Sequence, residues 1–183
     1  MKIVHVLLGK ADPDLMGGIN KVVHNLATEQ IKLNYNVSVW GMTDTPEKII
    51  HKHNYKLKLF LKKRNRFSLS KLLVECISNT STDTIFHLHS SFRPEIYAVS
   101  RHLRLNGLSW VLTPHGGYTP TSLKKSYWFK KFYRFLFESK IIKGACAIQS
   151  LGEPVSIKGV SYKVGVVPNG YELLNTYKQQ YVE

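Results

Sequence analysis

The 183-residue sequence has no uninterrupted apolar stretch of about 18 residues, the length that a membrane-spanning helix needs. It has only two cysteines, Cys76 and Cys146, which stand far apart and outside any CxxC spacing, so we expect two buried thiols and no disulfide. The N-terminal run MKIVHVLL has the length of a strand, and no small-residue cleavage site follows it, as a signal peptide would require. These absences predict a cytoplasmic protein, either free in solution or peripheral to a membrane.

Acidic residues are scarce. There are 12 Asp and Glu against 26 Lys and Arg, which gives a formal net charge of +14. Much of the excess lies in two stretches: one from Lys48 to Arg66 that contains no acid, and one from Lys124 to Lys143 in which Glu138 is the single acid. Positive charge clustered in this way indicates an anionic partner, either a phospholipid surface or a nucleic acid.

The chain also lacks internal repeats and low-complexity segments, and apolar runs of strand length alternate with segments of helical spacing. Strands are predicted at 3–8, 37–40, 55–61, 84–88, 109–113, 145–149 and 163–167. Helices are predicted at 19–31, 68–77, 94–105 and 123–142. Ser68 or Ser70 should cap the second helix, while Pro94 should open the third and Gly107 end it. The alternation favours the α/β class, with a Rossmann-like, doubly wound parallel sheet.

Right-handed crossovers bring the carboxyl ends of all parallel strands to one edge of such a sheet, where ligands bind. Seven polar, basic or glycine residues come after predicted strands and should gather there: Gly17, Gly18, His89, Arg93, His115, Gly116 and Gly117. The dinucleotide fingerprint G-x-G-x-x-G is missing, and no acid ends the second strand, which closes on Trp40-Gly41. A dehydrogenase is therefore disfavoured.

Some residues at this edge have two interpretations. Gly17 and Gly18 precede a helix, where backbone amides suit a phosphate or diphosphate, but a tight turn that needs glycine explains the pair equally well. His87 and His89 share one face of a strand, yet no Asp, Glu or Cys stands at ligand spacing, so we expect no metal site. His115, between a proline and two glycines, should present its ring to a polar ligand.

Four segments, in this order, carry a family resemblance: MGGINKVVHNLA, TIFHLHS, TPHGGYTPTSLKKSYWFKKFYRFLFESKIIKGACAIQS and VGVVPNGYE. Together they resemble the N-terminal domain of the retaining glycosyltransferases of family 4. These enzymes have the GT-B fold, in which two Rossmann-like domains face each other across a cleft. The resemblance runs from Met1 to about Glu172.

The resemblance implies roles for the residues at the sheet edge. Gly17 and Gly18 match glycines that approach the donor diphosphate. His115 matches the histidine that contacts the donor sugar near the scissile bond, which makes it the catalytic candidate. Contacts with the acceptor are expected from the residues that follow the fourth strand and from the paired-glycine loop: His89, Arg93, Gly116 and Gly117.

The resemblance also implies a domain arrangement and a reaction. Residues 1–172 would form the acceptor-side domain, an N-terminal GT-B half, and residues 173–183 the start of a linker or tail. The donor-binding domain, with its Arg/Lys pair and E-x7-E motif, is absent from the sequence, and Ser150 is followed by Leu151 where the family has Ser-Glu. The chain alone is therefore expected to be inactive.

The implied reaction, without a cofactor, is hexosyl transfer from a nucleotide diphosphate sugar to a membrane-anchored glycan or lipid acceptor. Such enzymes build lipopolysaccharide and other surface polysaccharides on the inner face of the cell membrane. The alternative is a non-catalytic Rossmann-like module that binds anionic lipid or nucleic acid.

The predicted helix from Leu123 to Ile142 is rich in aromatic and basic residues. At 100° per residue, Trp128, Phe132, Phe135, Leu136 and Ile142 form an apolar stripe that should face the core. Additional aromatic residues beside this stripe, next to a basic face, suit an anionic membrane surface. The expected contacts are Trp128, Phe129, Lys130, Lys131, Tyr133 and Arg134. Packing against another helix or the absent domain is the alternative, whereas nucleic acid is not expected because no recognised binding motif accompanies the pattern.

Overall fold

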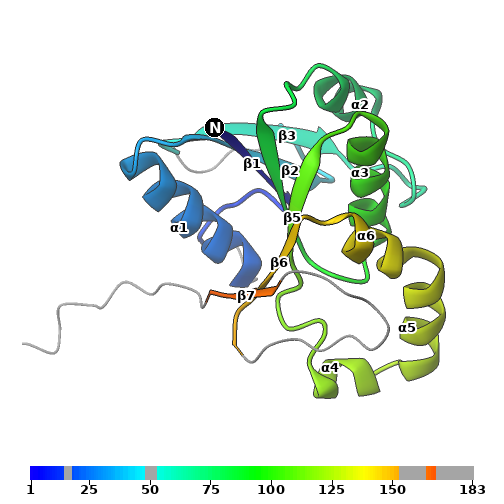
Figure 1. The fold of residues 1–183 in the computed structure, drawn as a ribbon. Helices are drawn as coiled ribbons and strands as arrows, with labels where there is room; N and C mark the ends of the chain where they lie inside the picture. The colour runs from blue at the N-terminus through cyan, green and yellow to red at the C-terminus, as the bar shows by residue number, and fades with distance from the viewer. Residues whose placement is uncertain (15–17, 48–52, 153–163, 168–183) are drawn as a thin grey trace, which may run out of the picture.

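The computed structural model describes residues 1–14, 18–47, 53–152 and 164–167. Seven parallel strands form one sheet in the order β3-β2-β1-β4-β5-β6-β7 (Figure 1). The strands are β1 (Lys2–Leu8), β2 (Asn36–Thr43), β3 (Lys56–Leu61), β4 (Thr84–His89), β5 (Ser109–Thr113), β6 (Ala147–Ser150) and β7 (Val164–Val166). The helices are α1 (Gly18–Lys32), α2 (Lys71–Ser78), α3 (Pro94–Leu105), α4 (Pro120–Lys124), α5 (Tyr127–Tyr133), the π-helical turn η1 (Arg134–Glu138) and α6 (Ser139–Gly144). The predicted Rossmann-like parallel sheet is confirmed.

The continuous apolar run of β1 is explained by helices on both faces of the sheet. Ile3 and Leu7 pack against α1, whereas Val4 and Val6 point into a larger core formed with α2, α3 and α6. Figure 1 shows α1 on one side of the sheet and these three helices on the other. A central strand of this kind has no solvent face and therefore shows no alternation of polar and apolar residues.

The predicted helix ends are also observed. The Ser70 hydroxyl caps α2 by accepting from the Leu73 amide, and Pro94 opens α3. Gly107 follows α3 with φ +66°, a left-handed conformation that glycine adopts without a steric penalty.

The helix predicted from Leu123 to Ile142 is different in the structure. The chain breaks between α4 and α5, where Ser126 has φ 57°, and the π-helical turn η1 then separates α5 from α6. A π turn adds a residue to the helical repeat and rotates everything beyond it, so projection at a constant 100° cannot be carried from α5 into α6. Trp128 and Phe132 lie before this turn, so for them the wrong face of α5 was assigned to the core. Trp128, Phe132 and Phe135, expected to face the core, are 75%, 63% and 79% exposed.

The buried side of this helical segment differs from the face expected from the sequence. It carries Tyr133, Glu138 and Ile141 together with Ile142, which was expected to face the core and does so; all four are less than 4% exposed. Tyr133, expected to contact the membrane, is therefore inside the protein. The sequence did not reveal this buried stripe because it contains Glu138. An acidic residue is expected at the surface unless the residues that pair with it are known.

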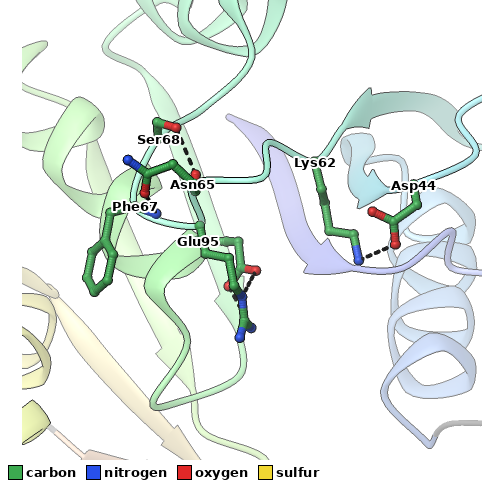
Figure 2. A network of polar contacts seen from close by, with 7 residues as sticks. Asp44, Lys62, Asn65, Phe67, Ser68 and Glu95 are labelled. Carbon is green, nitrogen blue, oxygen red and sulfur yellow. Dashed lines mark hydrogen bonds and ion pairs between the residues drawn. The ribbon is translucent and has the colours of Figure 1, made fainter.

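The basic stretch that ends at Arg66 is partly neutralised within the fold (Figure 2). The Lys62 ammonium lies 2.7 Å from Asp44, and the Arg66 guanidinium donates to both oxygens of Glu95 in α3, at 2.6 and 3.3 Å. Between them, the Asn65 carbonyl accepts from the Ser68 hydroxyl. These two cations hold the loop after β3 in place and are less available to an external anion.

Candidate functional site

The carboxyl ends of β1, β4 and β5 are neighbours in the sheet, and backbone strain is concentrated in the loops that follow them. Of the six non-glycine residues with positive φ in the described part of the chain, four lie in these loops: Ala11 (53°), Ser90 (105°), Phe92 (54°) and His115 (47°). Left-handed backbone is unfavourable for residues with a Cβ and is often retained at functional sites. The edge predicted from the sequence is thus the strained edge of the structure.

Four side chains form a hydrogen-bonded row on the α1 face of this edge, which we call the histidine chain: Gln30, His5, His89 and His115. Gln30 Oε1 lies 2.7 Å from His5 Nε2, His5 Nδ1 lies 3.0 Å from His89 Nε2, and His89 Nδ1 lies 2.9 Å from His115 Nε2. The row joins α1, β1, β4 and the loop after β5. It brings His89 and His115, both expected at this edge, into direct contact.

The histidine chain is uncharged at neutral pH. Burial lowers the pKa of His5 and of His115 to about 4. Burial, reinforced by the neighbouring imidazoles, also holds the pKa of His89 well below its ordinary value. His89 is 1% exposed and both of its nitrogens are hydrogen-bonded, so a direct contact with an acceptor would have to break one of these bonds.

His87 stands beside the histidine chain with partners of its own. Its ring is stacked on that of His89, with centroids 4.2 Å apart, and its Nε2 lies 2.6 Å from the Thr113 hydroxyl. That hydroxyl in turn donates to Gln149 Oε1 at 3.1 Å. Since the one hydroxyl proton of Thr113 goes to Gln149, His87 must be the donor to Thr113.

His5, His87 and His89 are buried, and their ligand atoms lie within 4.8 Å of one another, so a metal site has to be considered. Two nitrogens bound to one tetrahedral zinc are about 3.3 Å apart. The nitrogens of His5 and His89 are 3.0 Å apart, as a direct hydrogen bond requires, and Gln30 and Thr113 contact further ring nitrogens of the cluster. These residues fit a hydrogen-bonded cluster better than a preformed metal site.

The structural reason for glycine differs among the predicted glycine positions. Gly17 lies outside the described residues. A Cβ on Gly18, the first residue of α1, would meet no atom within 4 Å, and its φ is not positive, so the fold itself does not demand glycine there. Gly116 has φ +76° and open space around it, whereas a Cβ on Gly117 would lie 1.7 Å from Ser91 Oγ. Gly117 is therefore explained by close packing of the loops after β4 and β5.

Arg93, the other predicted acceptor contact, immediately precedes α3 and is exposed. Its guanidinium makes no hydrogen bond or ion pair with any residue in the described ranges. The structure thus leaves it available to a ligand but does not connect it to the histidine chain.

Glu138 is a site residue that sequence reasoning missed. Its buried carboxylate accepts from the Tyr118 hydroxyl at 2.5 Å and from the Phe92 amide at 3.1 Å, so it joins the loops after β4 and β5 from the helical side. Burial raises its pKa to about 7. The sequence feature that could have pointed to Glu138 is its position as the single acid in a stretch of basic residues. His5 and Gln30 were also missed, although a histidine inside an otherwise apolar central strand is itself unusual.

Five large side chains of α5 and its continuation into η1 are more than half exposed, and we call them the aromatic surface: Tyr127, Trp128, Phe129, Phe132 and Phe135. The Lys131 ammonium lies over the rings of Tyr127 and Trp128. Lys130 is instead half-buried, donates to Ser122 and lies over the Phe92 ring. None of the described helices combines the length and apolarity that crossing a bilayer requires.

Comparisons with known proteins bear on this geometry. The protein-family model for Glycosyltransferase Family 4 matches residues 16–173. Among solved structures, the chain is similar to one described as "Trehalose-6-phosphate from E. coli bound with UDP-2-fluoro glucose", with 14% identity and a TM-score of 0.49. That alignment covers 94% of this chain and 49% of the other, so this chain spans about half of that structure. No curated protein matches the sequence.

Proposed function

The chain belongs to glycosyltransferase family 4, and on that premise we propose that it forms one side of the active-site cleft of a retaining glycosyltransferase. The enzyme would transfer a hexosyl group from a nucleotide diphosphate sugar to a membrane-anchored glycan or lipid acceptor, in the synthesis of a surface polysaccharide. The observation that carries the proposal is the strained edge that holds His89 and His115, both of which lie within residues 16–173 that match the family.

His115 is the proposed catalytic residue. Its backbone is left-handed, and its ring is held by a hydrogen bond to the buried His89. A neutral imidazole can hydrogen-bond to a sugar hydroxyl, and such a bond accelerates the reaction if it strengthens in the transition state. A pKa of about 4 keeps the ring in this neutral form at physiological pH.

The glycines are proposed to serve the anionic part of the donor. The 15-residue helix α1 begins at Gly18, and the amides at a helix start attract phosphate. Open space at the Gly18 Cβ position is consistent with close approach of a diphosphate to Gly17 and Gly18. Gly116, with space around its left-handed backbone, is proposed to face the acceptor together with Arg93.

We further propose that the domain binds the inner face of the cell membrane through the aromatic surface. Exposed aromatic rings beside lysines suit the headgroup region of an anionic bilayer. Lys124, Lys125 and Lys131 are exposed next to these rings, and each cation near an anionic surface contributes about 1 kcal/mol. This arrangement would bring the acceptor edge close to a membrane-anchored substrate.

The test is sugar transfer by an enzyme in which this domain is joined to a donor-binding half. Labelled UDP-, GDP- and TDP-hexoses are supplied with membrane extracts as acceptors, and the anomeric configuration of the product is read by NMR. We expect transfer with retention, no turnover by the 183-residue chain alone, and a loss of about 100-fold or more in His115→Ala.

His102→Ala, near the carboxyl end of α3 and so at the opposite edge of the sheet, is the matched histidine control. An unchanged rate in a folded His115→Ala enzyme would remove the catalytic assignment. Absence of transfer from every donor would remove the enzymatic one.

A further inference from the structure

We propose that Gln30, His5 and His89 are positioning residues that fix the tautomer of His115, so that its Nδ1 is a hydrogen-bond acceptor. The three act through a directional row of hydrogen bonds and need not touch the substrate. The catalytic consequence rests on the proposed function, whereas the tautomer itself does not.

The direction of the row follows from the donors and acceptors that each group possesses. An amide oxygen only accepts, so Gln30 Oε1 requires a proton on His5 Nε2, 2.7 Å away. A neutral imidazole carries one proton, which leaves His5 Nδ1 as an acceptor for a proton on His89 Nε2. The same step repeats once more, so that His89 Nδ1 accepts from His115 Nε2.

The end of the row is the Nδ1 atom of His115. With the proton on Nε2, this nitrogen keeps a lone pair, and no described residue hydrogen-bonds to it. It therefore suits a ligand group that donates, such as a sugar hydroxyl, and does not suit a phosphate oxygen, which only accepts.

Because the two central members of the row are buried, the positions of their ring protons are strictly determined. His5 is 0% and His89 1% exposed, so water is not at hand to replace a missing partner. A second proton on the His5 or His89 ring would place its new N–H group opposite the N–H group of the next histidine in the row. Reversing one ring alone would leave a buried donor facing a donor, which is strongly unfavourable because neither group then has an acceptor. The row must therefore keep its direction or reverse as a whole.

His87 does not compete for these atoms. Its Nε2 proton goes to Thr113, whose own proton goes to Gln149, and the Gln149 amide nitrogen donates to the Val167 carbonyl at 3.0 Å. That last bond fixes which end of the Gln149 amide accepts. His87 thus supports the row by stacking on His89 without setting its direction.

The test changes Gln30, which is half-buried on α1 and can be replaced without opening the core. Gln30→Glu keeps an acceptor, Gln30→Met removes it, and Gln30→Lys replaces it with a donor. All three are good helix formers. Glu29→Met, an exposed neighbouring change that removes only the pair with Lys32, is the control.

The readout is the ring-nitrogen spectrum of ¹⁵N-histidine-labelled chain at neutral pH, which distinguishes protonated from unprotonated Nδ1 and Nε2. In the wild type, Gln30→Glu and Glu29→Met, we expect His115 to carry its proton on Nε2. In Gln30→Met, a second population with the proton on Nδ1 should appear, and in Gln30→Lys it should grow further. In the full enzyme, Gln30→Met should lower kcat about tenfold or more, and Gln30→Glu should restore it.

Three results would overturn the proposal: a wild-type His115 with its proton on Nδ1, a His115 spectrum identical in all Gln30 variants, or zinc-dependent shifts of the ring nitrogens. Because the spectra are recorded on the isolated chain without substrate, their outcome is independent of whether the enzyme transfers sugar. A confirmed tautomer with no transferase activity would leave the histidine row standing and remove only the proposed function.

Discussion

Replacing Glu138 by glutamine should change how the stability of the protein depends on pH. The wild-type carboxylate is 0% exposed and accepts two hydrogen bonds, from the Tyr118 hydroxyl and the Phe92 amide. A glutamine can keep both contacts, because its oxygen accepts from the amide and its nitrogen donates to the phenol oxygen. The substitution therefore removes the ionisable group and keeps the packing. The bond with Tyr118 reverses, so the phenol proton loses its acceptor, but this cost is the same at every pH.

The magnitude follows from the raised pKa of Glu138, about 7 in the folded protein against 4.5 when unperturbed. The folded state binds the proton more tightly than the unfolded state, so this group favours folding below pH 4.5 and loses that contribution as the pH rises through about 7. At 1.36 kcal/mol per pKa unit, the wild type should lose about 2–3 kcal/mol between pH 5 and pH 8.5 through this group. Glu138→Gln should lack this loss, so its stability relative to the wild type should rise by about 2–3 kcal/mol from pH 5 to pH 8.5.

Other groups titrate in the same range, so the difference between the two proteins is the quantity to measure. The buried histidines have lowered pKa values, and their contribution to stability is lost as the pH falls from about 6.5 toward 4, the opposite direction. The histidine contributions are the same in both proteins, so they cancel in the difference in stability. Glu75→Gln, which replaces an exposed acid on α2 that makes a 3.9 Å contact with the Lys71 ammonium, controls for loss of a surface charge.

The assay is urea-induced unfolding of wild type and both variants at pH 5 and pH 8.5. A difference of about 2–3 kcal/mol corresponds to roughly 5–10 °C in Tm for a domain of this size, so thermal unfolding gives an independent reading. If the stability difference between Glu138→Gln and wild type is the same at both pH values, Glu138 does not have a raised pKa and the reasoning fails.

Two further predictions concern the same helical segment. Tyr133→Phe should be neutral or stabilise by up to about 1 kcal/mol in urea unfolding, because the Tyr133 hydroxyl is buried and no residue in the described ranges hydrogen-bonds to it; a loss above 1 kcal/mol would reveal a partner. Lys124→Glu with Lys131→Glu should weaken co-sedimentation with anionic vesicles at low salt, since both cations flank the aromatic surface. Lys140→Glu with Lys143→Glu, beyond those rings, should not, and equal binding by both double variants would exclude this surface as the membrane contact.

The sequence was informative where local patterns decide structure. Buried parallel strands, the Ser70 cap and the proline and glycine that bound α3 all depend on neighbouring residues, and each is observed. The proximity of His89 and His115 was also within reach, because His89 ends one strand and His115 follows another, and carboxyl ends of parallel strands meet at one edge of the sheet.

The parts that could not be predicted depend on residues far apart in the chain. His5 is a polar residue in an apolar strand, and its place in the site requires both the pairing of β1 with β4 and a glutamine from α1. Glu138 looks like a surface acid until Tyr118 and the Phe92 amide are brought to it. The π turn that contains Glu138 has no strong sequence signal, so a constant 100° projection could not relate the faces of α5 and α6. Ile142 is buried as expected, whereas Trp128 and Phe132, before the turn, are exposed.

These missed residues explain how the strained edge can persist. Left-handed backbone at Ser90, Phe92 and His115 costs of order 1 kcal/mol or more at each residue, which must be offset by contacts in the folded state. The histidine chain holds the loop after β5 from the α1 face of the sheet, through His115. Glu138 holds both strained loops from the opposite face, through the Phe92 amide and the phenol of Tyr118. Because buried polar groups that lose a partner are penalised heavily, each contact resists relaxation of the loops more strongly than an exposed one would. The position of the His115 ring is thus determined from both sides of the sheet, by side chains that need never touch a substrate.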